Sequence, residues 1–139
     1  MPFELVIVTP HREAFRGRVD RVVLPGTEGE FGVLESHERF LCPLRLGHAE
    51  ISAGGSTVYA ALDPGFARVE GQAVSVLVDA CELAAEIDLA RTRAAEQSAR
   101  EALGMLGLSA DPVERARHEA ALARAQNLLA VAERAGRRS

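Results

Sequence analysis

The sequence predicts an α+β protein, in which an all-β module in residues 1–84 is followed by a helical hairpin in residues 85–139. Two observations indicate this. Up to residue 84, short apolar runs are separated by Gly, Pro and Asp at spacings typical of a sandwich or barrel. Beyond residue 84, glycine and β-branched residues become scarce and the helix-favouring Ala, Glu, Arg and Leu predominate.

Three segments of the β module carry clear strand signals. In residues 74–78, three valines alternate with other residues, which places them on one face of a strand. Residues 49–52 and 57–60 flank Gly54-Gly55, which predicts a hairpin because tight hairpin turns need positive φ. Residues 66–69 lie between two turn signals. We therefore expect residues 1–84 to be all β.

Two helices are expected after this module, over about 88–103 and 112–135. Asp88 can cap the first helix by accepting from its unpaired amides. A glycine-rich stretch then breaks the pattern, and Asp111 followed by Pro112 starts the second helix. Gly136 is expected to end it.

Alanine-rich stripes should join the two helices. They are Ala95, Ala99, Ala102 and Leu106 on the first helix and Ala121, Ala125, Leu128 and Ala132 on the second. Burying an Ala methyl stabilises by about 0.8 kcal/mol, against about 1.5–3 kcal/mol for a Leu side chain. The hairpin should therefore hold together weakly, and dock or detach at modest cost.

Composition excludes several classes of protein. A chain of 139 residues is too short for a two-lobed enzyme. A net charge of −4, 4% aromatic residues and no Trp argue against a nucleic-acid binder. Without an apolar run of about 18 residues or a leader before Phe3, we expect a soluble protein that reaches a membrane only through partners.

Charge is divided unevenly along the chain. Residues 1–84 carry 7 Arg and 12 acidic residues, a net charge of −5. Residues 85–111 carry 3 Arg and 5 acidic residues, a net charge of −2. Residues 112–139 carry 6 Arg and 3 acidic residues, a net charge of +3. The second helix is thus the basic element of an acidic protein. It presents either a solvated face or a surface for an acidic partner.

No catalytic or metal-binding pattern stands out. The chain has four histidines, His11, His37, His48 and His118. They lack the spacing of metal ligands, and Ser36 lies outside a Gly-x-Ser-x-Gly elbow. The glycines of residues 26–32 do not open into a helix, and no Lys completes a phosphate loop. We expect no catalytic residue and no metal, with Cys42 and Cys81 as free thiols.

Residues 24–37, read as Leu-Pro-Gly-Thr-Glu-Gly-Glu-Phe-Gly-Val-Leu-Glu-Ser-His, are the most specific segment. Followed by Phe40-Leu41, they closely resemble the hallmark segment of the ε subunit of bacterial F-type ATP synthases. The resemblance continues in residues 65–69, 74–79 and 87–91 and covers essentially the whole chain in order.

The resemblance implies a flattened ten-stranded β-sandwich followed by an antiparallel two-helix hairpin. It implies a non-catalytic central-stalk subunit that couples the γ subunit and the c-subunit ring during rotary, proton-driven ATP synthesis. The expected location is the cytoplasmic face of the bacterial inner membrane, as a peripheral protein. The missing Arg- and Ser-rich presequence disfavours a mitochondrial member.

Site residues follow from the resemblance. Glu28, Glu30, Phe31 and His37 match the family's loop that faces the c ring. The hairpin is the family's mobile tail, whose basic second helix meets an acidic segment of the catalytic β subunits, beside α, and hinders ATP hydrolysis. The residues matched to this role are Arg115, Arg117, Arg124 and Arg134.

Some family members also bind ATP on the folded hairpin. Ile87, Asp88, Arg91 and Arg124 match that motif, whereas Thr92 replaces its Ala. Leu128 stands where a second arginine is expected, and a lost phosphate contact costs about 1.5–3 kcal/mol. We therefore expect weak or absent ATP binding and no other cofactor. The alternative is a free-standing small-molecule sensor with a helical lid, which would bind its own ligand tightly and not depend on γ.

Overall fold

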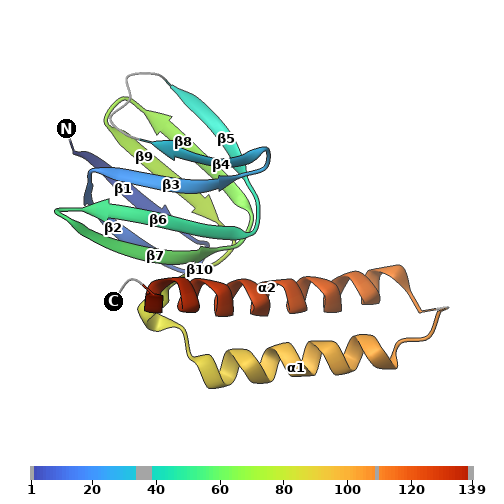
Figure 1. Ribbon diagram of the computed structural model, residues 1–139. Helices are drawn as coiled ribbons and strands as arrows, with labels where there is room; N and C mark the ends of the chain where they lie inside the picture. The colour runs from blue at the N-terminus through green and yellow to red at the C-terminus, as the bar shows by residue number, and fades with distance from the viewer. Residues whose placement is uncertain (1, 34–38, 109, 138–139) are drawn as a thin grey trace.

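The computed structural model describes residues 2–33, 39–108 and 110–137, without the side chain of Arg137. In this part of the chain, strands are followed by a 3-10 helix and two α-helices (Figure 1). The strands are β1 (Phe3–Val8), β2 (Glu13–Val19), β3 (Arg21–Gly26), β4 (Gly29–Val33), β5 (Phe40–Leu44), β6 (Gly47–Ala53), β7 (Ser56–Leu62), β8 (Gly65–Glu70), β9 (Ala73–Val78) and β10 (Cys81–Leu83). The helices are η1 (Ala84–Glu86), α1 (Leu89–Met105) and α2 (Pro112–Arg137).

The strands pair in the order β10-β7-β6-β3-β5-β8-β9-β1-β2, with β4 on β3, so the ten-stranded sheet folds over into two layers (Figure 1). β5 meets β3 at the pair Gly26 and Leu44, where the layers join. β1 runs parallel to β9 and antiparallel to β2. The predicted α+β fold, a sandwich followed by two helices, is confirmed.

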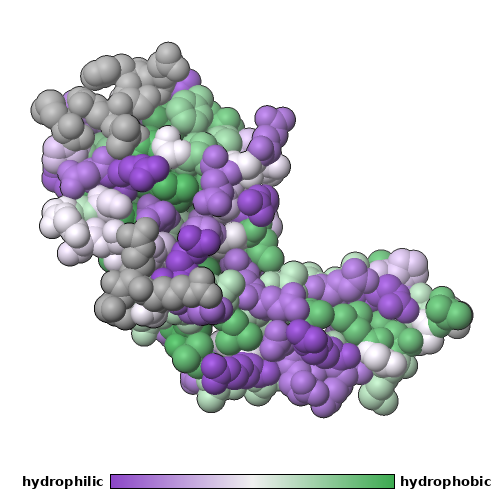
Figure 2. Space-filling model, in the orientation of Figure 1, coloured by the Kyte–Doolittle hydropathy of each residue, from purple (hydrophilic) through white to green (hydrophobic). Residues whose placement is uncertain are grey.

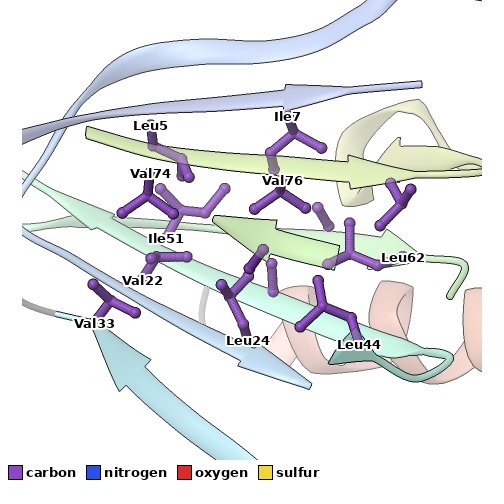
Figure 3. Close-up of a cluster of buried hydrophobic side chains, with 14 of the residues drawn as sticks. Leu5, Ile7, Val22, Leu24, Val33, Leu44, Ile51, Leu62, Val74 and Val76 are labelled. Atoms are coloured by element: carbon purple, nitrogen blue, oxygen red, sulfur yellow. The ribbon is translucent and has the colours of Figure 1, made fainter. Parts of the chain in front are cut away.

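The core lies between the two layers of the sandwich. Figure 3 shows the facing side chains, which come from β1 and β9 on one side and from β3, β6 and β7 on the other. Those at 2% exposure or less include Leu5, Ile7, Val22, Leu24, Ile51, Leu62, Val74 and Val76. The core is mainly aliphatic, and Phe3 is the fully buried aromatic side chain within it. Each buried Leu or Ile contributes about 1.5–3 kcal/mol, so the sandwich carries most of the stability.

The strand signals of the sequence are confirmed. β6 and β7 form the predicted hairpin, and Gly54 and Gly55 have φ of 58° and 84° at its turn. Such a pair of positive φ values matches the right-handed twist of the flanking strands. Val74, Val76 and Val78 all point into the core from β9.

Both helix starts have the predicted caps. The Asp88 carboxylate accepts from the Arg91 amide at 3.1 Å, and the Asp111 carboxylate accepts from the Val113 amide at 2.9 Å. The prediction that Gly136 ends the second helix was wrong, because α2 continues through it to Arg137. α1 ends at Met105, inside the glycine-rich stretch that was expected to break it. An exposed glycine costs a helix only about 1 kcal/mol, which a continuing helix tolerates.

The two helices pack against each other side by side (Figure 1). Ala99 and Ala125 are buried in this contact, but Ala95 and Ala121 are exposed, so the predicted stripes were partly wrong. On α1 the buried stripe includes Thr92, whose hydroxyl donates to the Asp88 carbonyl at 2.7 Å. That bond satisfies the hydroxyl within its own helix, which lets a polar residue occupy a buried position.

The far end of the hairpin extends beyond the sandwich. Figure 2 shows hydrophobic side chains gathered at this end, and Met105, Leu108 and Val113 are among the most exposed large apolar residues described. The opposite end of α2 lies beside β7 and η1 (Figure 1). The hairpin is thus attached to the sandwich along only part of its length.

Candidate interaction surfaces

Two polar contacts hold α2 against the outer face of β6 and β7. Arg124 Nη2 lies 2.6 Å from Asp63 Oδ2, and the Asn127 side-chain amide donates to the Gly47 carbonyl at 2.8 Å. Asp63 is buried, whereas the Arg124 side chain is 59% exposed. Water therefore weakens the ion pair, which contributes on the order of 1 kcal/mol.

A small apolar cluster lies beside these polar contacts. Tyr59 and Ala61 of β7 pack against Val131 of α2, and all three are buried. Ala84, Ile87, Leu128 and Ala135 surround them with partial exposure. Three of these seven side chains are alanines, which gain less from burial than larger apolar side chains. The hairpin docks on the sandwich through this small apolar cluster and the polar contacts beside it.

Replacing Arg124 with alanine should loosen this docking without unfolding the sandwich. Loss of the pair with Asp63 should raise the released fraction of the hairpin about fivefold, because 1 kcal/mol corresponds to that ratio. Amide hydrogen exchange of residues around Val131 measures this on the isolated chain. Arg117→Ala, an exposed arginine in the N-terminal half of α2, is the matched control and should leave exchange unchanged. Equal exchange in both variants would contradict the assignment.

Arg12, in the turn between β1 and β2, fastens the base of the hairpin. Its guanidinium donates to the Cys81 carbonyl at 2.8 Å and to Glu86 Oε1 at 3.3 Å. Glu86 Oε1 also accepts from the Leu83 amide at 3.1 Å. These bonds tie β10 and η1 to the sandwich. A hairpin that swings away would therefore pivot after Glu86.

The β3–β4 turn presents the acidic residues that the sequence singled out. Glu28 and Glu30 are exposed, and Gly29 between them has φ of 131°, a conformation that favours glycine. Phe31 is half-buried and meets Phe40 edge-on, with ring centroids 6.4 Å apart. Three of the four predicted loop residues are thus close together, while His37 lies outside the described residues.

An apolar groove runs along the face formed by β5, β8 and β9. It has a volume of about 690 Å³, and its lining includes Pro43, Phe66 and Leu77. Phe66 and Leu77 pair across β8 and β9 and are each 50% exposed, and Leu41 on β5 is 61% exposed. Our sequence analysis missed this face. Its signal was an apolar residue at outward positions of three strands, visible once the strand pairing is known.

The four arginines assigned to the basic helix lie in different settings. Arg115 donates to the Gly107 carbonyl at 3.1 Å and so braces the loop between the helices. Arg117 is exposed, and Arg124 is engaged with Asp63. Arg134 lies close enough to His48 of β6 for its positive charge to lower the pKa of that histidine. In the docked hairpin, Arg124 and Arg134 therefore face the sandwich.

The pocket that Arg124 lines does not gather the other residues of the possible nucleotide site. The pocket beside Arg124 holds about 40 Å³, and neither Asp88 nor Arg91 lines it. Sites for small molecules measure about 300–1,000 Å³. Leu128 packs in the apolar cluster with Ile87, which explains an apolar residue at that position.

A larger cleft of about 540 Å³ lies between β7, η1 and the end of α2. The described residues that line it, which include Thr57, Tyr59, Leu83 and Ala135, carry no charged side chain. Such a cleft offers nothing to the phosphates of a nucleotide. In the same part of the chain we find no group of three His, Cys, Asp or Glu that could hold a metal, and no helix long and apolar enough to cross a membrane.

Both cysteines are free thiols, as predicted. Cys81 is buried, and burial raises the pKa of its thiol to about 11. Burial, followed by the nearby Glu28, also raises the pKa of Cys42. Neither thiol is activated as a nucleophile, because the reactive form is the thiolate.

Known proteins similar to this chain match it over most of its length. A family model described as the beta-sandwich domain of the ATP synthase delta/epsilon chain matches residues 2–84. The ATP synthase epsilon chain of Nitratidesulfovibrio vulgaris (strain DP4) is 41% identical over 121 residues, which are 87% of this chain and 88% of that protein. The ATP synthase epsilon chain of Geotalea uraniireducens (strain Rf4) is 40% identical, over 95% and 94% of the two chains.

The chain belongs to the ATP synthase epsilon-chain family.

Solved structures agree with this epsilon-chain assignment. A chain of the Euglena gracilis mitochondrial ATP synthase, solved as OSCP/F1/c-ring, has a TM-score of 0.77 and 26% identity, with coverage of 93% of this chain and 80% of that one. A chain of the Tetrahymena thermophila mitochondrial ATP synthase, solved as central stalk and c ring, has the same fold, with a TM-score of 0.57 and 12% identity over 93% and 95% of the two chains. The resemblance seen in the sequence is confirmed at the level of the epsilon-chain family.

Proposed function

We propose that this epsilon chain is a non-catalytic central-stalk subunit of a proton-translocating F-type ATP synthase, where it couples the γ subunit to the c ring. It works at the cytoplasmic face of a bacterial inner membrane, held there by its partners. Support comes from the family and from a similar chain solved within a complex that contains F1 and the c ring. The observation that carries the proposal is the exposed apolar face of β5, β8 and β9.

That face suits a protein partner such as γ. Its aromatic and aliphatic side chains lie on rigid strands, and an apolar centre with a polar rim is typical of stable interfaces. The docked helices cover β6 and β7 instead, so this face stays open. A subunit that rotates with γ needs such a contact, one that is independent of where the hairpin lies.

The β3–β4 turn suits the c ring. Glu28 and Glu30 present negative charge at an exposed turn, and Phe31 is anchored on Phe40. Exposed acidic side chains on a short hairpin can contact polar loops while the strands behind them transmit torque. His37 is assigned to the same loop by resemblance alone.

The hairpin acts as a brake on ATP hydrolysis when it leaves the sandwich. Release frees Arg124 from Asp63 and moves Arg134 away from His48, so both become available to an acidic segment of the β subunits near α. The limited docking contact supports this role, because the released form lies only a small free energy above the docked one. ATP remains a weak or absent regulatory ligand, given the 40 Å³ pocket beside Arg124.

Replacing Arg115, Arg117, Arg124 and Arg134 together by alanine tests the brake in a reconstituted complex. Hydrolysis should rise several-fold, because the helix loses the positive charge that attracts an acidic partner. Arg18→Ala, which changes an exposed arginine of β2 in the sandwich, controls for the loss of surface charge and should not raise hydrolysis by the same factor. Unchanged hydrolysis in the fourfold variant, with the complex fully assembled, would contradict the proposal.

The alternative of a free-standing sensor predicts a different result. Such a protein would bind a small molecule in the cleft near Tyr59 and would not need γ. Co-purification with γ and β separates the two: the stalk subunit copurifies with both, and the sensor with neither.

A further inference from the structure

His48 lies on β6 directly beneath α2. The bond from Asn127 to the Gly47 carbonyl, 2.8 Å long, brings the helix next to it, and the Tyr59 ring lies 6.5 Å away between centroids. Only 16% of the His48 side chain is exposed. Its Nε2 atom is buried and has no hydrogen-bond partner within the described part of the chain. A titratable group therefore lies in the contact between hairpin and sandwich, and its buried Nε2 makes no hydrogen bond there.

Four charged groups among the described residues act on His48. Glu30 Oε2 of β4 lies 3.7 Å from Nε2, and Glu50 of β6 and Arg45 before β6 also act on the ring, as does Arg134 of α2. Burial lowers the pKa of His48 below its usual 6.5, and Arg134 lowers it further against the opposing effect of Glu30 and Glu50. Of these charged groups, Arg134 alone belongs to the hairpin, so hairpin release removes one cation and leaves both carboxylates.

We propose that His48 is a proton-sensitive element of the hairpin contact: neutral His48 permits docking, and protonation of His48 favours the released hairpin. A proton on the ring would place a second cation beneath Arg134 in a site with little water. In the released state the same proton would face Glu30 and Glu50 in a more solvated setting. The acidic groups and the exposed site then stabilise the imidazolium.

The direction of the pH effect follows from this difference. At pH well above 6.5, His48 is neutral in both states and does not affect docking. As the pH falls through the pKa that His48 has in the released state, His48 is protonated in that state first, and the released population grows. The increase in the released population is complete once the pH lies below the pKa of His48 in the docked state, which is the lower of the two pKa values. The ratio of released to docked hairpin changes about tenfold for each unit between the two pKa values.

Nuclear magnetic resonance of the isolated full-length chain tests the proposal. The Val131 methyl shifts report docking, and the His48 ring protons report its titration between pH 8 and 5.5. We expect the docked population to fall several-fold over this range. His48→Gln should abolish most of the pH dependence, while the matched variant His11→Gln, at an exposed histidine of the β1–β2 turn, should keep it.

A second variant guards against a folding defect in the first. Arg134→Gln should raise the pKa of His48 and reduce the pH dependence of docking. Equal pH dependence in wild type and His48→Gln, or a wild-type hairpin that stays docked at pH 5.5, would overturn the proposal. The inference uses the docked hairpin of the proposed function but is measured without the ATP synthase. If docking follows pH while inhibition of hydrolysis does not, the brake fails and the proton-sensitive contact stands.

Discussion

Gly65→Ala should destabilise the sandwich by at least about 3 kcal/mol, because overpacking in a tight site costs about 1–3 kcal/mol and more against backbone. A Cβ at Gly65 would overlap the Leu77 carbonyl oxygen and lie 2.7 Å from the Val78 Cα. Both atoms belong to the backbone of β9, which pairs with β8 at this position. The strands cannot separate there without breaking their hydrogen bonds, so the strain cannot relax locally. Urea denaturation of the isolated chain measures the loss.

Gly104→Ala is the matched control, with the same chemical change and the opposite expected sign. Gly104 lies in α1, and a Cβ there meets no atom within 4 Å. Alanine is better than glycine in a helix by up to about 1 kcal/mol, less near a helix end. We therefore expect neutral or slightly raised stability. A Gly65→Ala variant as stable as Gly104→Ala would show that β8 and β9 are not packed as closely as described.

Much of this fold could be predicted because its signals are local. The β6–β7 turn needs two residues of positive φ, and Gly54-Gly55 supplies them. The caps at Asp88 and Asp111 depend on carboxylates that accept from amides two or three residues further along the chain. Periodicity and turn chemistry operate within a few residues, so one sequence is enough to read them.

The alanine stripes and the helix ends were harder to predict from sequence, because packing against neighbouring elements decides them. Ala95 and Thr92 are both compatible with a helix face, and the rotation of α1 against α2 decides which is buried. Gly136 continues α2, since the end of that helix packs beside the sandwich at Ala135. Tertiary contact outweighs a local stop signal of about 1 kcal/mol.

The candidate surfaces likewise divide into one formed by a contiguous segment and others formed by residues that the fold brings together. The β3–β4 turn follows from one contiguous segment, so its residues could be chosen from sequence and resemblance. The pair of Arg124 and Asp63 joins residues 61 positions apart in sequence, and the apolar groove gathers three strands. His48 carries no sequence signal at all, because its role depends on α2 lying over β6. Long-range juxtapositions of this kind require the fold.

Phe66→Asp should remove γ binding while leaving the sandwich folded. Phe66 is 50% exposed, so a polar residue there costs the isolated subunit little. In the proposed interface the same carboxylate would be buried against an apolar partner beside Leu77, where an unpaired charge is strongly disfavoured. Loss of an aromatic anchor at the centre of an interface costs at least about 2 kcal/mol, or roughly 30-fold in affinity. Calorimetric titration of the full-length chain with γ measures this.

Leu108→Asp is the control that makes the result specific. Leu108 is a fully exposed apolar residue at the far end of the hairpin, so the substitution makes the same kind of change away from the groove. We expect its affinity for γ to equal that of the wild type. If Phe66→Asp lowers the melting temperature, the milder Leu77→Ser tests the same face with less risk to folding. If both groove variants bind γ normally, γ contacts another part of the sandwich. Two adjacent side chains at the centre of the proposed interface would both be expected to contribute to the affinity.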